Sequence, residues 1–379
     1  MVRYRDLGLT VGQLPPGPLN AITDVDGVAV GMTTLIEGDG ALQVGSGPIR
    51  TGVTVVVPHP GIAGGPVFAG CHRLNGNGEL TGLEWIRESG QLTTPVALTN
   101  THSVGIVRDA LVAADMRERD DLTAYWSLPI VGETYDGALN DINGMHVRSE
   151  HLFGALDSAG SGPIAEGGVG GGTGMICHEF KGGTGTASRV TGEWTVGALV
   201  QANYGRRERL TVDGVPVGRE IPLSAVPSPW DEEVRIAKQA VPGEPGAGSI
   251  IVILATDAPM MPHQLERLAQ RAGLGIARVG GAGEHSSGDI FLAFSTGNRG
   301  SIESYKAEGS TTPIEVSMIP EGAISELFWG AIEATEEAIL NALVAAETMI
   351  GRDGITAHRL DHTELVDVMT RYGRGPNSR

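Results

Sequence analysis

Residues 243–259, GEPGAGSIIVILATDAP, change character at a single serine. Before Ser249 the chain holds glycine, proline, one alanine and one charge, and after it an uninterrupted apolar run reaches Ala255. A short β-branched run bounded by turn residues is typical of a strand buried on both faces. A flexible segment therefore ends on a hydroxyl group at the mouth of a buried strand.

Similar runs along the chain predict a layered arrangement of strands and helices. We expect further buried strands at 51–57, 196–201, 289–295 and 313–319. Apolar residues at three- and four-residue spacings predict helices at 107–117, 262–272 (ending at Gly273), 323–350 (ending at Gly351) and 363–372 (capped by Thr363, ending at Gly373). A proline-rich stretch, 222–248, predicts a linker with a possible short helix at 231–239. The fold class is therefore α/β or α+β, and 379 residues allow one large domain or two.

Composition restricts the possible partners. Lys and Arg number 27 against 45 Asp and Glu, a formal charge of −18 that disfavours nucleic acid and anionic membranes. The two cysteines, Cys71 and Cys177, are too few for a disulfide framework. Because no secretory signal and no apolar stretch of membrane-spanning length is visible, we expect a soluble, cytoplasmic protein.

Several common catalytic motifs are missing. The histidines form no H-E-x-x-H pair, so we expect no metal, and no G-x-S-x-G elbow marks an α/β-hydrolase. The glycine-rich tract 167–189 lacks both phosphate-binding patterns, so we expect tight turns near a site where backbone approaches a ligand, and no nucleotide or other cofactor.

Ser249 offers another route to hydrolysis. If its hydroxyl attacked the carbonyl of Gly248, an ester would form that water could hydrolyse, leaving a free α-amine beside the same hydroxyl. Glycine tolerates the strained backbone that this attack needs. An α-amine has a pKa of about 7.7–8.0, so it can accept a proton near neutral pH. A serine that merely ends a loop is the alternative interpretation.

Three other polar clusters carry candidate site residues. In 284–289, EHSSGD, Ser287 and Asp289 lie two apart before a strand and project to the same side, which predicts a hydroxyl against Ser249 with a carboxylate behind it. Asn203 lies in QANYG, 201–205, at the end of the strand expected at 196–201, and its side-chain amide can donate to an oxyanion. Glu133 and Tyr135 lie in VGETYDGALNDINGMH, 131–146. Taken singly, each cluster also fits ordinary loop chemistry.

Together these motifs resemble the family of L-aminopeptidase/D-esterases and β-peptidyl aminopeptidases. The resemblance runs along almost the whole chain, through NAITDVDGVAVG (20–31), ETYDGALNDINGMH (133–146), the glycine-rich tract, VQANYGRR (200–207), GAGSIIVILATDAP (246–259) and SSGDIFLAFSTGN (286–298). It implies a four-layer α-β-β-α sandwich of the N-terminal-nucleophile-hydrolase type, with its own connectivity. It also implies a single domain, 1–379, that cuts itself into 1–248 and 249–379, and a tetramer of these processed heterodimers.

The resemblance assigns roles to the candidate residues. Ser249 is the nucleophile, Asn203 the oxyanion donor, and Ser287 and Asp289 the supporting pair, with Asp a shorter acid than Glu would be at that position. Glu133 and Tyr135 line the pocket, and a carboxylate there pairs with the free amine of a short peptide, amide or ester. Two alternatives stay open. One is a self-processing acyltransferase similar to ornithine acetyltransferases, which carry a threonine nucleophile, and the other is an unprocessed binding protein. The sequence does not distinguish β-, D-α- or L-α-amino acids at the substrate's N-terminus.

Overall fold

The computed structural model describes residues 1–230, 246–302, 313–376 and 378. Two β-sheets face each other across an apolar layer in which Leu98 and Ile130 of one sheet meet Ile251 and Leu292 of the other. One sheet has the strand order β1 (Ala29–Glu37), β2 (Ile49–Val57), β5 (Val96–Asn100) and β6 (Ile130–Thr134). The other has the order β4 (Gln91–Leu92), β3 (Val67–Arg73), β12 (Asp289–Ser295), β11 (Gly246–Thr256), β10 (Trp194–Gly205) and β9 (Gly183–Thr191).

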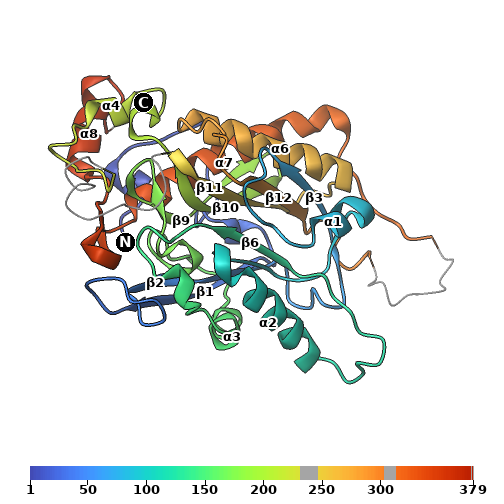
Figure 1. Ribbon diagram of the computed structural model, residues 1–379. Coiled ribbons are helices and arrows are strands. Elements are labelled where there is room, and N and C mark those ends of the chain that lie inside the picture. The colour runs from blue at the N-terminus through green and yellow to red at the C-terminus, as the bar shows by residue number, and fades with distance from the viewer. Residues whose placement is uncertain (231–245, 303–312, 377, 379) are drawn as a thin grey trace.

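Helices cover the outer face of each sheet (Figure 1). Helices α6 (Pro262–Arg278) and α7 (Ile324–Val344) pack on the six-stranded sheet, and α2 (Val104–Arg117) and α3 (Ser149–Asp157) pack on the four-stranded sheet. The central strands β11 and β12 are apolar along their length because both of their faces are covered. The expected α-β-β-α sandwich is therefore confirmed.

The remaining elements lie around this sandwich. They are α1 (Leu83–Ser89), α4 (Val217–Glu220), α8 (His362–Arg371), and two hairpins, β7 (Ile176–Cys177) with β8 (Phe180–Lys181) and β13 (Met349–Ile350) with β14 (Thr356–Ala357). None of the helices in the described part of the chain is sufficiently long and apolar to span a bilayer.

The strands expected at 51–57, 196–201, 249–255 and 289–295 are confirmed, but the one expected at 313–319 is wrong. Residues 313–318 are exposed and belong to no strand, although their apolar alternation imitates one. An alternating apolar pattern is not sufficient for a strand, because a strand also needs a neighbouring strand with which to form hydrogen bonds. The possible helix at 231–239 lies outside the described residues.

Three expected helix boundaries also differ from the structure. Helix α6 continues through Gly273 to Arg278, and its later turn packs closely on α7, where a Cβ added at Gly275 would lie 2.6 Å from the Ile332 carbonyl oxygen. Helix α7 ends at Val344 rather than near Gly351, since Met349 and Ile350 pair with β14 instead. Asp361, not Thr363, caps α8 by accepting from the N–H groups of Thr363 and Glu364.

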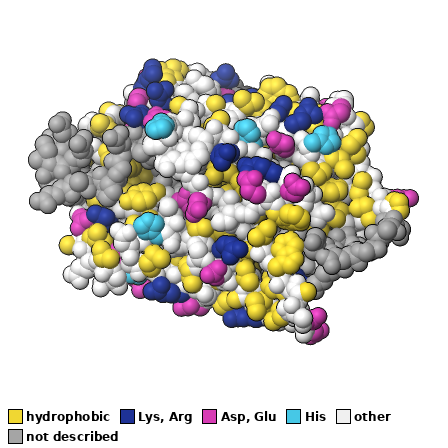
Figure 2. Space-filling view, turned by 45° about the vertical axis from the view of Figure 1, so that its right-hand side comes forward, with side chains coloured by type: hydrophobic (Ala, Val, Ile, Leu, Met, Phe, Trp, Pro, Cys, Tyr) yellow, Lys and Arg dark blue, Asp and Glu magenta, His cyan; other side chains and the backbone are white. Residues whose placement is uncertain are grey.

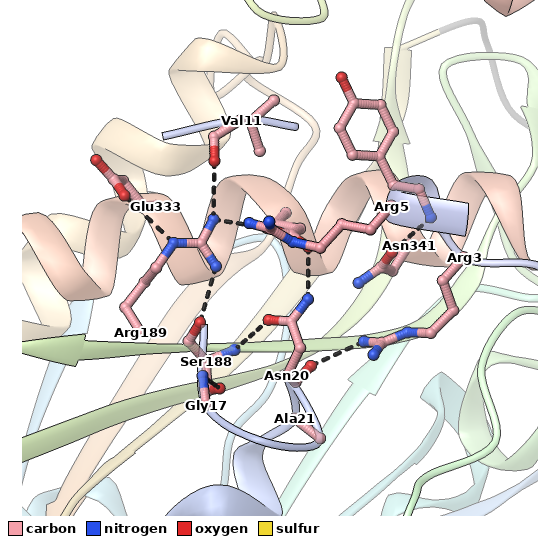
Figure 3. A network of polar contacts seen from close by, with 12 residues as sticks. Arg3, Arg5, Val11, Gly17, Asn20, Ala21, Ser188, Arg189, Glu333 and Asn341 are labelled. Carbon is pink, nitrogen blue, oxygen red and sulfur yellow. Dashed lines mark hydrogen bonds and ion pairs between the residues drawn. The ribbon is translucent and has the colours of Figure 1, made fainter. Parts of the chain in front are cut away.

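A buried polar network fixes the N-terminal segment to α7 and β9 (Figure 3). Arg189 Nη2 lies 2.6 Å from Glu337 Oε2, and Arg5 Nε lies 2.6 Å from the other oxygen of the same carboxylate. The Asn20 side chain donates to Glu337 and accepts from the Ser188 N–H. These paired charges hold the pKa of Glu337 below its usual value despite burial. On the surface, by contrast with this buried network, Lys and Arg side chains are interspersed with Asp and Glu over the face shown in Figure 2.

Candidate active site

Ser249 and Asn203 lie directly opposite each other on the antiparallel strands β11 and β10. Directly opposed side chains share a face of the sheet, with Cβ atoms about 4.5–5.5 Å apart. Both residues are more than nine-tenths buried. Ile251, two residues after Ser249 on β11, projects to the same face and packs in the layer between the two sheets. The structure thus brings the expected nucleophile and the expected oxyanion donor together at one end of that layer.

The residue before Ser249 has room only for glycine. A Cβ added at Gly248 would lie 1.9 Å from the carbonyl oxygen of Asn203. Any side chain at position 248 would therefore push β11 away from β10 beside the nucleophile.

Ser287 and Asp289 form the expected hydroxyl–carboxylate pair, with Ser287 Oγ donating to Asp289 Oδ1 at 2.6 Å. The residue between them makes the contact with the nucleophile, because the Gly288 N–H donates to Ser249 Oγ at 3.0 Å. The expectation of a hydroxyl directly against Ser249 is thus replaced by a backbone amide, with the pair beside it.

Asp289 lies on the other face of the sheet from Ser249. Its cross-strand neighbour is Ile250, whose side chain packs in the helix-facing layer, and the Ile250 N–H is 3.3 Å from Asp289 Oδ1. Burial raises the pKa of Asp289, while the hydrogen bond from Ser287 opposes that rise. The carboxylate is therefore connected to the nucleophile through the loop 287–288 and through the strand backbone.

The side chain of Asn203 is fixed at both ends. Its Oδ1 accepts from the Ile176 N–H at 2.8 Å, and its Nδ2 donates to the Tyr135 carbonyl oxygen at 2.9 Å. The Ile176 N–H can only donate and the Tyr135 carbonyl can only accept, so these two partners fix which end of the Asn203 amide is oxygen and which is nitrogen. Since Nδ2 carries two hydrogens and Tyr135 takes one, the second can be donated to a reacting oxygen.

Glu133 is buried near the end of β6, close to the 287–288 loop. Its Oε1 accepts from the Glu79 N–H at 3.0 Å and its Oε2 accepts from the Thr101 hydroxyl. A Cβ added at Gly78 would lie 3.1 Å from Glu133 Oε1 and 3.1 Å from the Gly288 Cα, so the carboxylate and the 287–288 loop approach one glycine. Burial raises the pKa of Glu133.

Tyr135 contributes its backbone more than its ring. Its carbonyl oxygen accepts from Asn203, whereas its partly exposed ring lies over its own loop, where a Cβ at Gly137 would lie 2.3 Å from the phenol oxygen. The structure thus brings Glu133 beside the 287–288 loop, whereas the Tyr135 ring packs against the backbone of its own loop at Gly137.

Two asparagines distant in sequence also contact the 286–289 segment. Asn75 Oδ1 accepts from the Asp289 N–H at 2.7 Å, and Asn77 Nδ2 donates to the Ser286 carbonyl oxygen at 2.7 Å. Both asparagines belong to an Asn-Gly-Asn-Gly run, 75–78, whose composition marks a turn but not its neighbour in space.

The glycine-rich tract packs beneath the strands. A Cβ at Gly171 would lie 2.2 Å from Gln201 Oε1, and one at Gly172 would lie 2.3 Å from the Thr184 N. These glycines therefore permit close packing between segments of the protein itself. Within the described ranges, no cluster of three or more His, Cys, Asp or Glu is suited to hold a metal ion.

Comparison with known proteins gives a consistent result. The model of peptidase family S58 matches residues 20–357. Beta-peptidyl aminopeptidase BapA of Sphingosinicella microcystinivorans is 49% identical over 378 residues, covering 98% of this chain and 93% of the relative.

Two solved structures are similar over nearly their whole length. A Burkholderia sp. beta-aminopeptidase has a TM-score of 0.88 and 54% identity, covering 98% of this chain and 99% of its own. The L-aminopeptidase D-Ala-esterase/amidase from Ochrobactrum anthropi, described as a new variant of the Ntn hydrolase fold, has a TM-score of 0.86 and 45% identity, with the same coverage.

Proposed function

The chain belongs to peptidase family S58 and is a serine aminopeptidase, and from this premise we propose that Ser249 is the nucleophile for both self-cleavage and substrate hydrolysis. One observation carries the proposal: the Ser249 hydroxyl lies opposite the Asn203 amide, directly after a glycine that no larger residue can replace without displacing Asn203. The chain then consists of a single domain, 1–379, divided into 1–248 and 249–379.

Self-cleavage requires only groups in this arrangement. Ser249 Oγ attacks the Gly248 carbonyl carbon, the C–N bond of Gly248–Ser249 breaks, and the released amine takes a proton while an ester links Gly248 to Oγ. Water then hydrolyses the ester, giving a carboxylate on Gly248 and a free α-amine on Ser249. The Gly288 N–H, 3.0 Å from Oγ, positions the attacking oxygen.

Hydrolysis of a substrate repeats this chemistry in the processed enzyme. The α-amine of Ser249 accepts the hydroxyl proton, Oγ attacks the first carbonyl of the substrate, and the Asn203 Nδ2–H stabilises the oxyanion. The leaving amine departs with a proton and water hydrolyses the acyl-enzyme. Ser287 and Asp289 support the loop that carries the Gly288 N–H, and Asp289 stabilises positive charge on the nearby α-amine.

The substrate is a short peptide, amide or ester with an unblocked N-terminus. Glu133 supplies the buried carboxylate that pairs with the substrate's ammonium, which rejects acylated N-termini. The relatives' names identify beta-peptidyl aminopeptidases and an L-aminopeptidase D-Ala-esterase/amidase, so we place β-amino acids and small α-amino acids at the cleaved position.

The processed chains assemble as a homo-oligomer in this proposal, as tetramers of heterodimers. Large apolar side chains in two segments support association, since each is more than a third exposed: Leu122, Trp126, Leu128, Ile314, Val316 and Met318.

Ser249→Ala tests the proposal. We expect the variant to remain a single full-length chain by intact-mass spectrometry and to release no p-nitroaniline from alanyl or β-homoalanyl anilides. Ser295→Ala is the matched control, because Ser295 is a buried serine at the far end of neighbouring β12 and donates to the Ala258 carbonyl oxygen. Self-cleavage of Ser249→Ala, or active wild-type enzyme consisting only of full-length chain, would refute the assignment.

A further inference from the structure

Lys181 is completely buried, yet the described contacts of its ammonium are with carbonyl oxygens rather than carboxylates. Nζ donates to the carbonyl oxygens of Gly182 at 2.7 Å and Met175 at 2.9 Å, and more distantly to Gly172 at 3.5 Å. Burying a cation without a counter-ion is unfavourable. Burial lowers the pKa of Lys181 to about 7, and both the ammonium and the neutral amine carry N–H groups that donate to these oxygens.

A two-residue hairpin places this side chain opposite Ile176. Strands β7 and β8 pair Ile176 with Lys181, and the turn residues His178 and Glu179 both have left-handed backbone, with φ of 48° and 65°. Positive φ at both turn residues is the mark of a type I′ turn, which fixes the register of a hairpin. The His178 N–H donates to the Tyr204 carbonyl oxygen at 2.7 Å, which attaches the turn to the end of β10.

One peptide group joins Lys181 to Asn203. The Met175 carbonyl accepts from Lys181 Nζ at 2.9 Å and from the Gly182 N–H at 2.9 Å. The N–H of the same peptide group, that of Ile176, donates to Asn203 Oδ1 at 2.8 Å. The hydrogen bonds therefore run without interruption from Nζ through the Met175–Ile176 peptide to the Asn203 amide.

We propose that Lys181 is a positioning residue of the reaction, which orients and polarises the Asn203 amide through the Met175–Ile176 peptide so that Nδ2–H is a stronger donor to the oxyanion. The proposal rests on the proposed function, in which Asn203 is that donor.

Each link in this chain strengthens the next. An N–H donor on a carbonyl draws electron density from the peptide nitrogen, and does so most strongly when it is an ammonium, so the Ile176 N–H becomes a better donor. Its hydrogen bond polarises the Asn203 carbonyl in the same sense, and Nδ2 in turn becomes more positive. A donor held in place before the reaction needs no reorganisation when negative charge develops, which is the requirement for oxyanion stabilisation.

A double-mutant cycle tests the relay. Lys181→Met removes the N–H groups and shortens the unbranched side chain by one heavy atom. The variant is measured alone and combined with Asn203→Ala, with kcat, KM and the rate of self-cleavage determined for each. We expect Lys181→Met to lower kcat about tenfold with KM nearly unchanged, since a whole oxyanion donor contributes about 10²–10³-fold and Lys181 acts only through it. In the Asn203→Ala background the same change should cause no further loss, because the donor is already absent.

Arg50→Met is the control for loss of a buried cation bound to carbonyl oxygens. The Arg50 guanidinium donates to the carbonyl oxygens of Ile49, Glu37 and Ile350, and it also pairs with the exposed Asp39 carboxylate at 2.8 Å. We expect it to reduce thermal stability and to leave kcat of the folded enzyme unchanged. A loss of kcat from Lys181→Met that multiplies in the Asn203→Ala background, or no loss at all, would overturn the relay alone. Wild-type kcat in Asn203→Ala would overturn the donor assignment and the relay with it.

A measurement on the unaltered enzyme covers the case in which Lys181→Met does not fold. An aminoalkyl boronic acid forms a tetrahedral adduct with an N-terminal serine, and its negative charge should strengthen every hydrogen bond in the relay. We expect the amide proton resonance of Ile176 to move downfield on adduct formation, with the amide proton resonance of Ala110, buried in α2 on the outer face of the four-stranded sheet, unmoved. An Ile176 resonance that does not respond would overturn the relay.

Discussion

Gly248→Ala perturbs the proposed cleavage site without removing any reacting group. The added Cβ would lie 1.9 Å from the Asn203 carbonyl oxygen and 2.9 Å from its carbon, whereas real Cβ atoms keep at least 3.0 Å. The two strands must therefore separate by about 1 Å at Ser249, a misplacement that can cost about 10²-fold in rate. The strain should also reduce stability by about 1–3 kcal/mol, as overpacking does.

The assay is the time course of self-cleavage, followed by intact-mass spectrometry after the full-length chain has been purified. We expect about 10²-fold slower appearance of the 1–248 and 249–379 fragments. Gly105→Ala is the matched control, because a Cβ at this position in α2 meets nothing within 4 Å and should raise stability by about 0.5–1 kcal/mol. Maturation of Gly248→Ala at the wild-type rate would refute the link between strand spacing and cleavage.

Three further changes test the groups around Ser249. Asp289→Asn should lower kcat about 10²-fold. Because the α-amine of Ser249 must be neutral to accept a proton, and the Asp289 carboxylate stabilises its charged form, the acid limb of the pH–rate profile should move to lower pH in the variant. Glu133→Gln should raise KM for free-amine substrates about 10–100-fold with little change in kcat, as expected for loss of a charged hydrogen bond; an equal loss of kcat would remove Glu133 from ammonium binding. Asp136 is completely buried, with a pKa raised from 3.8 to about 6, chiefly by burial. Between these values the folded chain keeps a proton that the unfolded chain has lost, so the free energy of unfolding should fall by about 2 kcal/mol as the pH rises from 4 to 6. Thermal unfolding of Asp136→Asn should lack this component, and an unchanged pH dependence would contradict it.

Local patterns in the sequence predicted much of the site because strand geometry fixes the relation between near neighbours. The spacing of Ser287 and Asp289 predicted that they meet, and the position of Asn203 at the end of one apolar run and of Ser249 at the start of another predicted two strand ends. Which strand ends pair is a property of the whole fold, and for that the resemblance was needed.

Contacts between distant segments could not be read from the chain. Lys181 acts on Asn203 through a hairpin formed within an apparently featureless glycine-rich tract, and Asn75 reaches Asp289 across more than 200 residues. Whether a side chain is buried also depends on distant segments. The segment 313–319 has a strand-like alternation of apolar residues, yet its side chains are exposed to solvent except at Ile319. Such residues become visible only when neighbours in space are known.

The order of the six-stranded sheet has a consequence for an enzyme cut after Gly248. Strands β11 and β12 would belong to one fragment, yet β10 and β3, which flank them, would belong to the other. The shorter fragment would thus be interleaved with the longer one, and it could leave only by breaking both ladders and the core together. Exchange of isotopically labelled fragments between mature molecules should therefore be as slow as global unfolding.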